Sequence, residues 1–129
     1  MNVYLDDMRP APDTYILINN IQTIKALLEV HGLIKHLSLD HDLGACGTCM
    51  RLYGVTDAQE WLNKSKGTSM PHCPHVGTGY DLVLWMMANG KWPQHKPTVH
   101  SANPEGQQLM RAAIDRYFPT IQSVGDEVI

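Results

Sequence analysis

The chain lacks several features that would mark common protein classes. Three cysteines, an odd number, argue against the disulfide framework of a small secreted domain. Ten basic residues are outnumbered by 13 acidic ones, and a net charge of −3 is unlike that of a general nucleic-acid-binding protein. No apolar run approaches the roughly 20 residues of a transmembrane helix, and the first residues do not resemble a signal peptide. We therefore expect a soluble cytoplasmic protein with no membrane association.

Common nucleotide and hydrolase motifs are also missing. The sequence contains no P-loop, no dinucleotide-binding glycine fingerprint and no Gly-x-Ser-x-Gly elbow. ATP-dependent, NAD-dependent and serine-hydrolase functions therefore have no support. The 129 residues suit one domain with a core of its own, and we treat 1–129 as that single domain.

Short apolar runs alternate with segments of helical periodicity. We predict strands at 2–5, 14–18, 37–39 and 98–100, and helices at 21–30, 78–89 and 104–117, with a final strand or a folded-back tail at 120–124. In the last helix we expect five residues to face inward: Leu109, Met110, Ala113, Ile114 and Tyr117. This order predicts an α/β fold, a three-layer sandwich with a mainly parallel sheet and helices on both faces.

Polar residues directly follow three of the predicted strands. Asp6 and Asp7 come after the first strand, the segment 40–42 (Asp-His-Asp) after the third, and the segment 100–103 (His-Ser-Ala-Asn) at the end of the fourth. In a parallel sheet the carboxyl ends of the strands share one edge, where ligands bind. The carboxylates, imidazoles, hydroxyl and amide would then converge on one pocket, which indicates a site for a divalent metal or a phosphate.

Four catalytic residues are proposed from this pattern: His41, His100, Asp40 and Asp42. The two imidazoles titrate near neutral pH and are the candidates for acid and base, and Asp42 would orient one of them. Asp6 and Asp7, together with Asp40, would hold Mg²⁺ or Mn²⁺, because a cation relieves the repulsion between packed carboxylates.

The candidates for substrate binding are Arg9, Ser101 and Asn103. Arg9 would clamp a phosphate in bidentate fashion, and the other two would donate to phosphate oxygens. The simpler alternatives are that Arg9 is a solvated surface charge and that Asn103 only caps the following helix. An aspartate at a strand end can likewise be a turn former, and His100 can be a core histidine bonded to backbone.

Four segments taken together resemble a known family: 5–10 (LDDMRP), 38–44 (SLDHDLG), 78–81 (TGYD) and 100–106 (HSANPEG). They are similar to the cyclic-phosphate-processing receiver-like domains, which look like response-regulator receivers put to another use. The resemblance covers most of residues 1–118. It implies a receiver-like (flavodoxin-like) sheet and enzymatic handling of cyclic phosphates, such as RNA 2′,3′-cyclic ends, in bacteria or phages.

A comparison with receivers refines what the resemblance implies. Asp6 and Asp7 match the acidic pair that holds Mg²⁺, Asp40 matches the phosphoacceptor, and Ser101 loosely matches the following Ser or Thr. The receiver lysine after the fifth strand has no counterpart at 120–124, whereas two histidines are added. The missing lysine argues against a phosphorylation switch, and the histidines favour acid–base chemistry.

All three cysteines lie in a segment that interrupts the pattern, the predicted insert at 44–77. Cys46 and Cys49 form a C-x₂-C knuckle, and Cys73 with His75 supplies a second pair, so we predict a structural tetrahedral zinc. His72 is an alternative fourth ligand; buried cysteines without metal and a redox-active pair are the other interpretations. Between the knuckles we predict a short helix at 56–62, capped by Asp57 or Thr56, with Trp61 packed inward.

Two classes of function remain open. The first is a metal-assisted phosphoesterase acting on cyclic or terminal phosphates, for which the small number of basic residues favours a small nucleotide or an RNA end as substrate. The second is a non-catalytic receiver-like module that binds a phosphorylated ligand or partner. The sequence does not reveal an oligomeric state.

Overall fold

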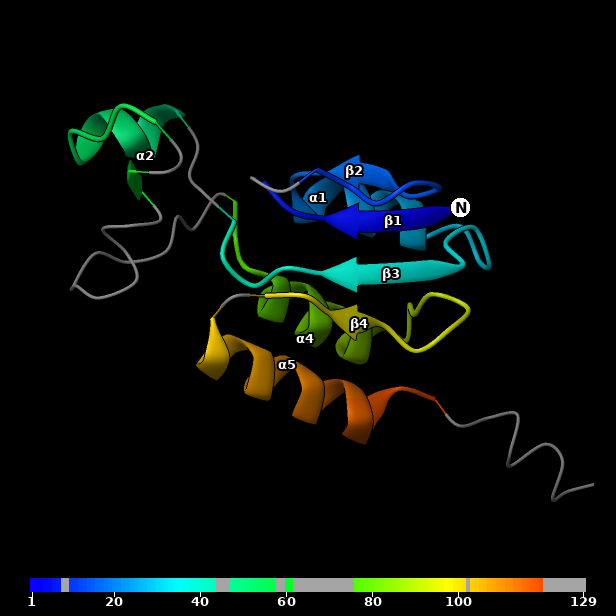
Figure 1. The fold of residues 1–129 in the computed structure, drawn as a ribbon. Helices are drawn as coiled ribbons and strands as arrows, with labels where there is room; N and C mark the ends of the chain where they lie inside the picture. Colours follow the sequence, from blue (N-terminus) through cyan, green and yellow to red (C-terminus); the bar gives the residue numbers. More distant parts are fainter. Residues whose placement is uncertain (8–9, 44–46, 58–59, 62–75, 102, 120–129) are drawn as a thin grey trace, which may run out of the picture.

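The computed structural model describes residues 1–7, 10–43, 47–57, 60–61, 76–101 and 103–119. Its elements, in chain order, are β1 (Asn2–Leu5), β2 (Ile16–Ile18), α1 (Ile21–Leu28), β3 (His36–Leu39), α2 (Gly47–Leu52), α4 (Gly79–Asn89), β4 (Thr98–Val99) and α5 (Pro104–Tyr117) (Figure 1). The strand or tail predicted at 120–124 lies outside the described residues.

The four strands form one sheet in the order β2-β1-β3-β4, and all neighbouring pairs are parallel. The predicted receiver-like parallel α/β sheet is therefore confirmed. In the register between β1 and β3, Leu5 lies opposite Leu39. The residues that follow these two strands consequently leave the sheet side by side at the same edge.

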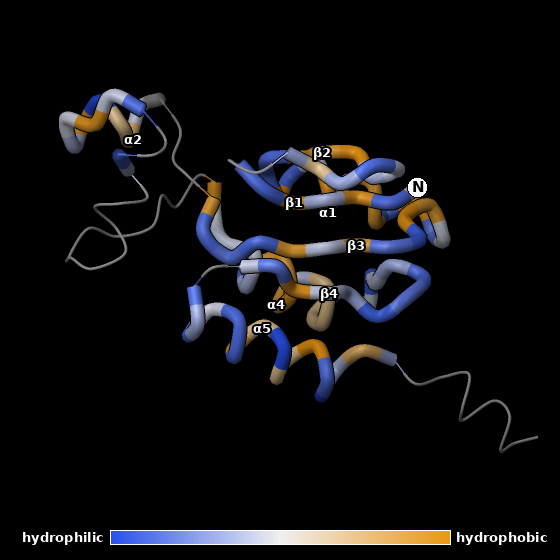
Figure 2. Tube along the Cα trace, in the orientation of Figure 1, coloured by the Kyte–Doolittle hydropathy of each residue, from blue (hydrophilic) through white to orange (hydrophobic). Residues whose placement is uncertain are grey.

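The apolar core lies on one face of this sheet. Val3 and Leu5 of β1, Leu37 and Leu39 of β3 and Val99 of β4 form one cluster with the buried residues of α1, α4 and α5. Figure 2 shows that the tube changes from hydrophobic to hydrophilic where β1 and β3 end. The helices α1, α4 and α5 all contribute buried residues to this one cluster.

The helices begin and end at residues whose chemistry explains their bounds. The Thr78 hydroxyl accepts a hydrogen bond from the Asp81 backbone N–H (3.1 Å), and the Asp81 carboxylate accepts one from the Thr78 N–H (2.9 Å), which completes a capping box for α4. Gly90 ends α4 in the left-handed region (φ 64°) that glycine adopts without strain. Asn103 caps α5 by accepting from Gly106 N–H at 3.1 Å.

The inward face of α5 differs from the prediction at two positions. Met110, Ala113 and Ile114 are buried as expected, but Leu109 is 50% exposed and Tyr117 is 44% exposed. The buried residues of α5 are Gly106, Met110, Ala113 and Ile114, so its buried stripe is narrower than the one predicted. The prediction for Leu109 and Tyr117 was wrong for this reason.

The chain between β3 and α4 leaves and rejoins the domain at one place. Asp42 and Thr78 form an isolated antiparallel bridge, and Gly79 N–H donates to the His41 carbonyl oxygen at 3.0 Å. Between them, Cys49, Val55 and Trp61 form a second, small hydrophobic cluster. Trp61 is 1% exposed, as predicted.

The predicted cap at Asp57 is also present, because its carboxylate accepts from Glu60 N–H at 2.8 Å.

Among the helices of the described residues, none is both long and apolar enough to cross a membrane.

Candidate functional site

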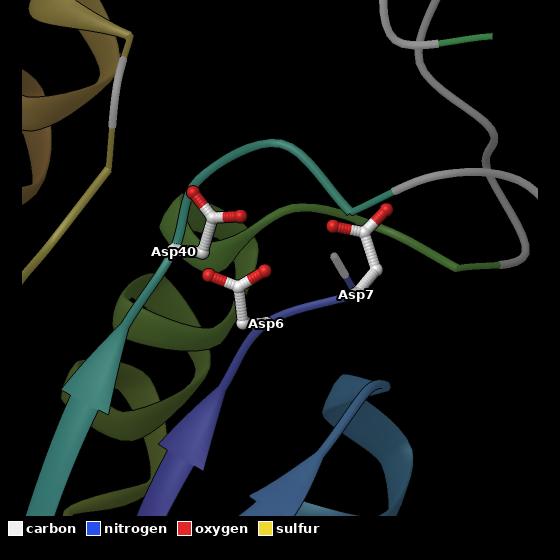
Figure 3. A group of neighbouring side chains, drawn as sticks. All are labelled: Asp6, Asp7 and Asp40. Atoms are coloured by element: carbon white, nitrogen blue, oxygen red, sulfur yellow. The ribbon is translucent and has the colours of Figure 1, made fainter. Parts of the chain in front are cut away.

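Three carboxylates gather at the edge where β1 and β3 end. Each of Asp6, Asp7 and Asp40 offers a ligand oxygen, and these oxygens lie within 4.8 Å of one another. Figure 3 shows the three side chains grouped above the two strand ends. The parallel pairing of β1 with β3 produces this arrangement, because it places Asp6 and Asp40 one residue beyond a register pair.

The cluster is electrostatically unfavourable without a counter-charge. Burial raises the pKa of the Asp40 carboxyl from 3.8 to about 7, and the negative charges of Asp6, Asp7 and Asp42 contribute in the same direction. A hydrogen bond from the His41 backbone N–H (2.9 Å) opposes the shift. Several hard oxygen ligands that repel one another are what Mg²⁺ or Mn²⁺ requires, so the predicted acidic trio can hold a divalent cation.

His41 is paired with Asp42 in the same loop. Its Nδ1 lies 2.7 Å from Asp42 Oδ1, and the two side chains are 10% and 8% exposed. Asn103 Nδ2 donates to the same carboxylate oxygen at 3.4 Å. A carboxylate at Nδ1 fixes a proton there, so that Nε2 is the nitrogen that can accept one.

Two glycines allow the helices to approach this loop. A Cβ built on Gly106 would lie 2.5 Å from Cγ of His41, and one built on Gly79 would lie 2.0 Å from the carbonyl oxygen of Asp40. Neither distance is compatible with a side chain. The glycines of the segments 78–81 and 100–106 therefore have a steric reason, which the sequence alone did not reveal.

His100 forms a hydrogen-bonded chain that crosses three strands. Its Nε2 lies 3.0 Å from Asp6 Oδ2, and its Nδ1 lies 2.7 Å from the Ser38 hydroxyl. The ring stacks on Tyr4 at 3.9 Å between centroids and 5° between planes. Sequence reasoning did not predict that Ser38 and Tyr4 contact His100. The available signal was that each places a hydroxyl-bearing side chain between two aliphatic residues of its strand.

The structure thus brings together six of the predicted site residues: Asp6, Asp7, Asp40, His41, Asp42 and His100. Ser101 is 2% exposed and its hydroxyl accepts from Asn103 N–H at 3.0 Å. Asn103 caps α5 and contacts Asp42, which agrees with the simpler structural interpretation. The phosphate contacts predicted for these two residues stay predictions.

The remaining predicted residues have a different status. Arg9, Cys46, Cys73 and His75, and the alternative ligand His72, lie outside the described residues. Cys49 is described and is buried in α2 against Trp61 and Val55. One cysteine cannot test a four-ligand zinc site.

Comparison with known proteins adds one finding. A family model described as the cyclic-phosphate processing receiver domain matches residues 1–116. No curated protein and no solved structure shows a significant match. The match spans all four strands and nearly all of α5, and includes every residue of the cluster.

Proposed function

The chain belongs to the family of cyclic-phosphate processing receiver domains, and on this premise we propose that it is a metal-assisted phosphoesterase. Its substrates would be cyclic or terminal phosphates of a small nucleotide or of an RNA end. The observation that carries the proposal is the position of the His41–Asp42 pair directly after Asp40, the residue that joins Asp6 and Asp7 in the carboxylate cluster. A proton-transfer group and a cation site thereby share one sheet edge.

Asp6, Asp7 and Asp40 are proposed to hold the cation. A bound Mg²⁺ or Mn²⁺ would neutralise phosphoryl oxygens and help to ionise a water molecule. Asp6 is 1% exposed and is held by His100, so it supplies the most constrained oxygen of the three. Asp7 and Asp40 are partly exposed and complete the side that faces the solvent.

His41 is proposed to move the proton. With Nδ1 held by Asp42, its Nε2 accepts a proton from the attacking water as the water oxygen bonds to phosphorus. The bond from phosphorus to one ribose oxygen then breaks, and the imidazolium returns a proton to that oxygen. The product is a phosphate monoester with a free hydroxyl, so atoms and charge balance. The sequence analysis named His41 and His100 together as the candidates for acid and base, and the steps proposed here use His41 for both transfers.

The insert at 44–77 is proposed to be part of this single domain and to form a wall or lid beside the site. The residues on either side of the insert are joined next to His41 by the antiparallel bridge between Asp42 and Thr78. A structural zinc held by Cys46, Cys49, Cys73 and His75 is proposed to stabilise it, since the described apolar cluster here contains only three buried residues.

The test is hydrolysis of 2′,3′-cyclic nucleotides and cyclic-ended RNA with Mg²⁺, Mn²⁺ or EDTA. Turnover should require the metal. His41→Asn keeps an amide donor near the position of Nδ1 but cannot transfer protons, so we expect kcat to fall about 10²- to 10⁴-fold. His31→Gln, at an exposed histidine, is the matched control. A folded, metal-loaded protein without turnover would reject the enzyme and favour a phosphate-binding module.

A further inference from the structure

His100 is held on three sides by this protein's own residues. Both ring nitrogens hydrogen-bond within the domain, Nδ1 with Ser38 and Nε2 with Asp6, and one ring face is covered by Tyr4. The side chain is 14% exposed, and that of Asp6 is 2% exposed. A group that exchanges protons with a substrate needs a ring nitrogen within hydrogen-bond reach of the reacting oxygen. Both nitrogens of His100 are instead engaged by Ser38 and Asp6.

We infer that His100 is a positioning residue, which together with Ser38 fixes the carboxylate of Asp6 for a divalent cation. This inference rests on the proposed function only in assigning Asp6 as a cation ligand. Hydrogen bonds from a second layer of residues orient the ligands of metal sites, and losing one typically costs about 10- to 100-fold in metal affinity. By holding Oδ2 of Asp6, His100 fixes the rotation of the carboxylate in the cluster.

Ser38 has a specific place in this chain. It lies on β3, opposite Tyr4 of β1 and Thr98 of β4 in the sheet register. His100 follows β4 and must extend past β3 to reach Asp6 and Tyr4, which belong to β1 and its end. The small serine side chain leaves room for the ring, and its hydroxyl supplies the bond to Nδ1. A larger apolar residue would remove both the space for the ring and the hydrogen bond to Nδ1.

Amide substitutions separate positioning from proton transfer. In His100→Gln the amide nitrogen can occupy the place of Nε2 and donate to Asp6, but it cannot transfer a proton. His100→Leu keeps the bulk and removes the hydrogen bonds. Ser38→Ala removes one bond, and Ser38→Thr restores the hydroxyl on a residue suited to a strand. His95→Gln, at an exposed histidine whose ring stacks on His36 and not on the residues around Asp6, is the control.

The measurement is Mn²⁺ affinity by titration calorimetry, after unfolding curves confirm that each variant is folded. We expect Mn²⁺ affinity to fall at least tenfold in His100→Leu and about fivefold in Ser38→Ala, the scale of one neutral hydrogen bond. The affinity should stay within about threefold of wild type in His100→Gln and return towards it in Ser38→Thr. If His100→Leu does not fold, the two Ser38 variants still decide the question.

Two results would overturn the inference. One is unchanged Mn²⁺ affinity in both His100→Leu and Ser38→Ala, and the other is a wild type that binds no Mn²⁺. Turnover gives an independent check, because loss of a proton-transferring group costs about 10²- to 10⁴-fold, whereas we expect less than a tenfold loss of kcat in His100→Gln. If the wild type binds Mn²⁺ but hydrolyses no cyclic phosphate, the proposed function fails while the affinity series still supports the positioning role.

Discussion

Replacing Asp40 with Asn should stabilise the metal-free protein at alkaline pH. Burial, followed by the charges of Asp6 and Asp7, raises the pKa of Asp40 from 3.8 to about 7. Because this pKa is higher in the folded protein than in the unfolded chain, the contribution of Asp40 to stability is fully present below about pH 4 and is lost as the pH rises through about 7. The amide of D40N cannot ionise and avoids this loss.

The size of the effect follows from the geometry of the cluster. For a fully buried group, the change in pKa would correspond to about 4 kcal/mol of unfolding free energy. Asp40 is partly exposed and solvent screens its charge, so we expect about 2 kcal/mol. Two carboxylate charges at the 4.8 Å limit of the cluster repel by about 3 kcal/mol at an effective dielectric constant of about 20, which is the same order.

The assay is urea and thermal unfolding in EDTA at pH 4 and pH 8. D40N should exceed the wild type by about 2 kcal/mol, or about 8 °C in Tm, at pH 8, and should match it at pH 4. Its amide oxygen can still accept from the His41 backbone N–H, so the turn is preserved. Asp13→Asn removes one charge at an exposed position and should have little effect.

Added Mn²⁺ should reverse the order of stability. The cation would bind the three carboxylates of the wild type, and D40N would lack one of them, so the wild type should gain more stability from the metal. A D40N protein that is no more stable than wild type at pH 8 without metal would refute the charge-repulsion argument. An equal gain in Asp13→Asn would also refute it, because net charge alone would then explain the effect.

Two further predictions concern the surroundings of the site. Gly106→Ala would normally stabilise a helix by up to about 1 kcal/mol, but here the new Cβ would lie 2.5 Å from Cγ of His41. We therefore expect thermal unfolding to show a loss of about 1 to 3 kcal/mol in stability, and we expect kcat to fall. The control is Gln108→Ala, at an exposed position of the same helix, whose stability should stay within about 0.5 kcal/mol of wild type. Cys49→Ser should lower both the zinc content measured by mass spectrometry and the Tm; a purified wild type without zinc, together with an unchanged Tm in the variant, would contradict the zinc proposal.

The sequence predicted the sheet because its strands and helices have clear local signals. Apolar runs ended in turn residues, and Thr78, Gly90 and Asn103 marked helix ends by chemistry that acts within a few residues. The meeting of Asp6, Asp7 and Asp40 also followed from one rule, that parallel strands end at a common edge. These predictions needed no knowledge of distant contacts.

The hydrogen-bond partners could not be predicted in the same way. The sequence suggested that Asp42 orients one of the two histidines, and the structure pairs it with His41. The carboxylate that bonds to His100 is instead that of Asp6, 94 positions away in the chain. Choosing between such partners requires the order of the strands and the direction of each ring, and neither is encoded by local periodicity.

The alternation within β1 and β3 separates the apolar core from the residues that hold His100. A parallel strand covered on both faces reads as a continuous apolar run, whereas Ser38 stands between Leu37 and Leu39 and pairs with Tyr4 in the next strand. The two leucines enter the core, and the serine, at the alternate strand position, faces the opposite side of the sheet. That face is where the ring of His100 can lie across β3 and reach Asp6. An apolar residue at position 38 would remove the hydroxyl that bonds to Nδ1 of His100, and with it one of the contacts that hold this ring against Asp6.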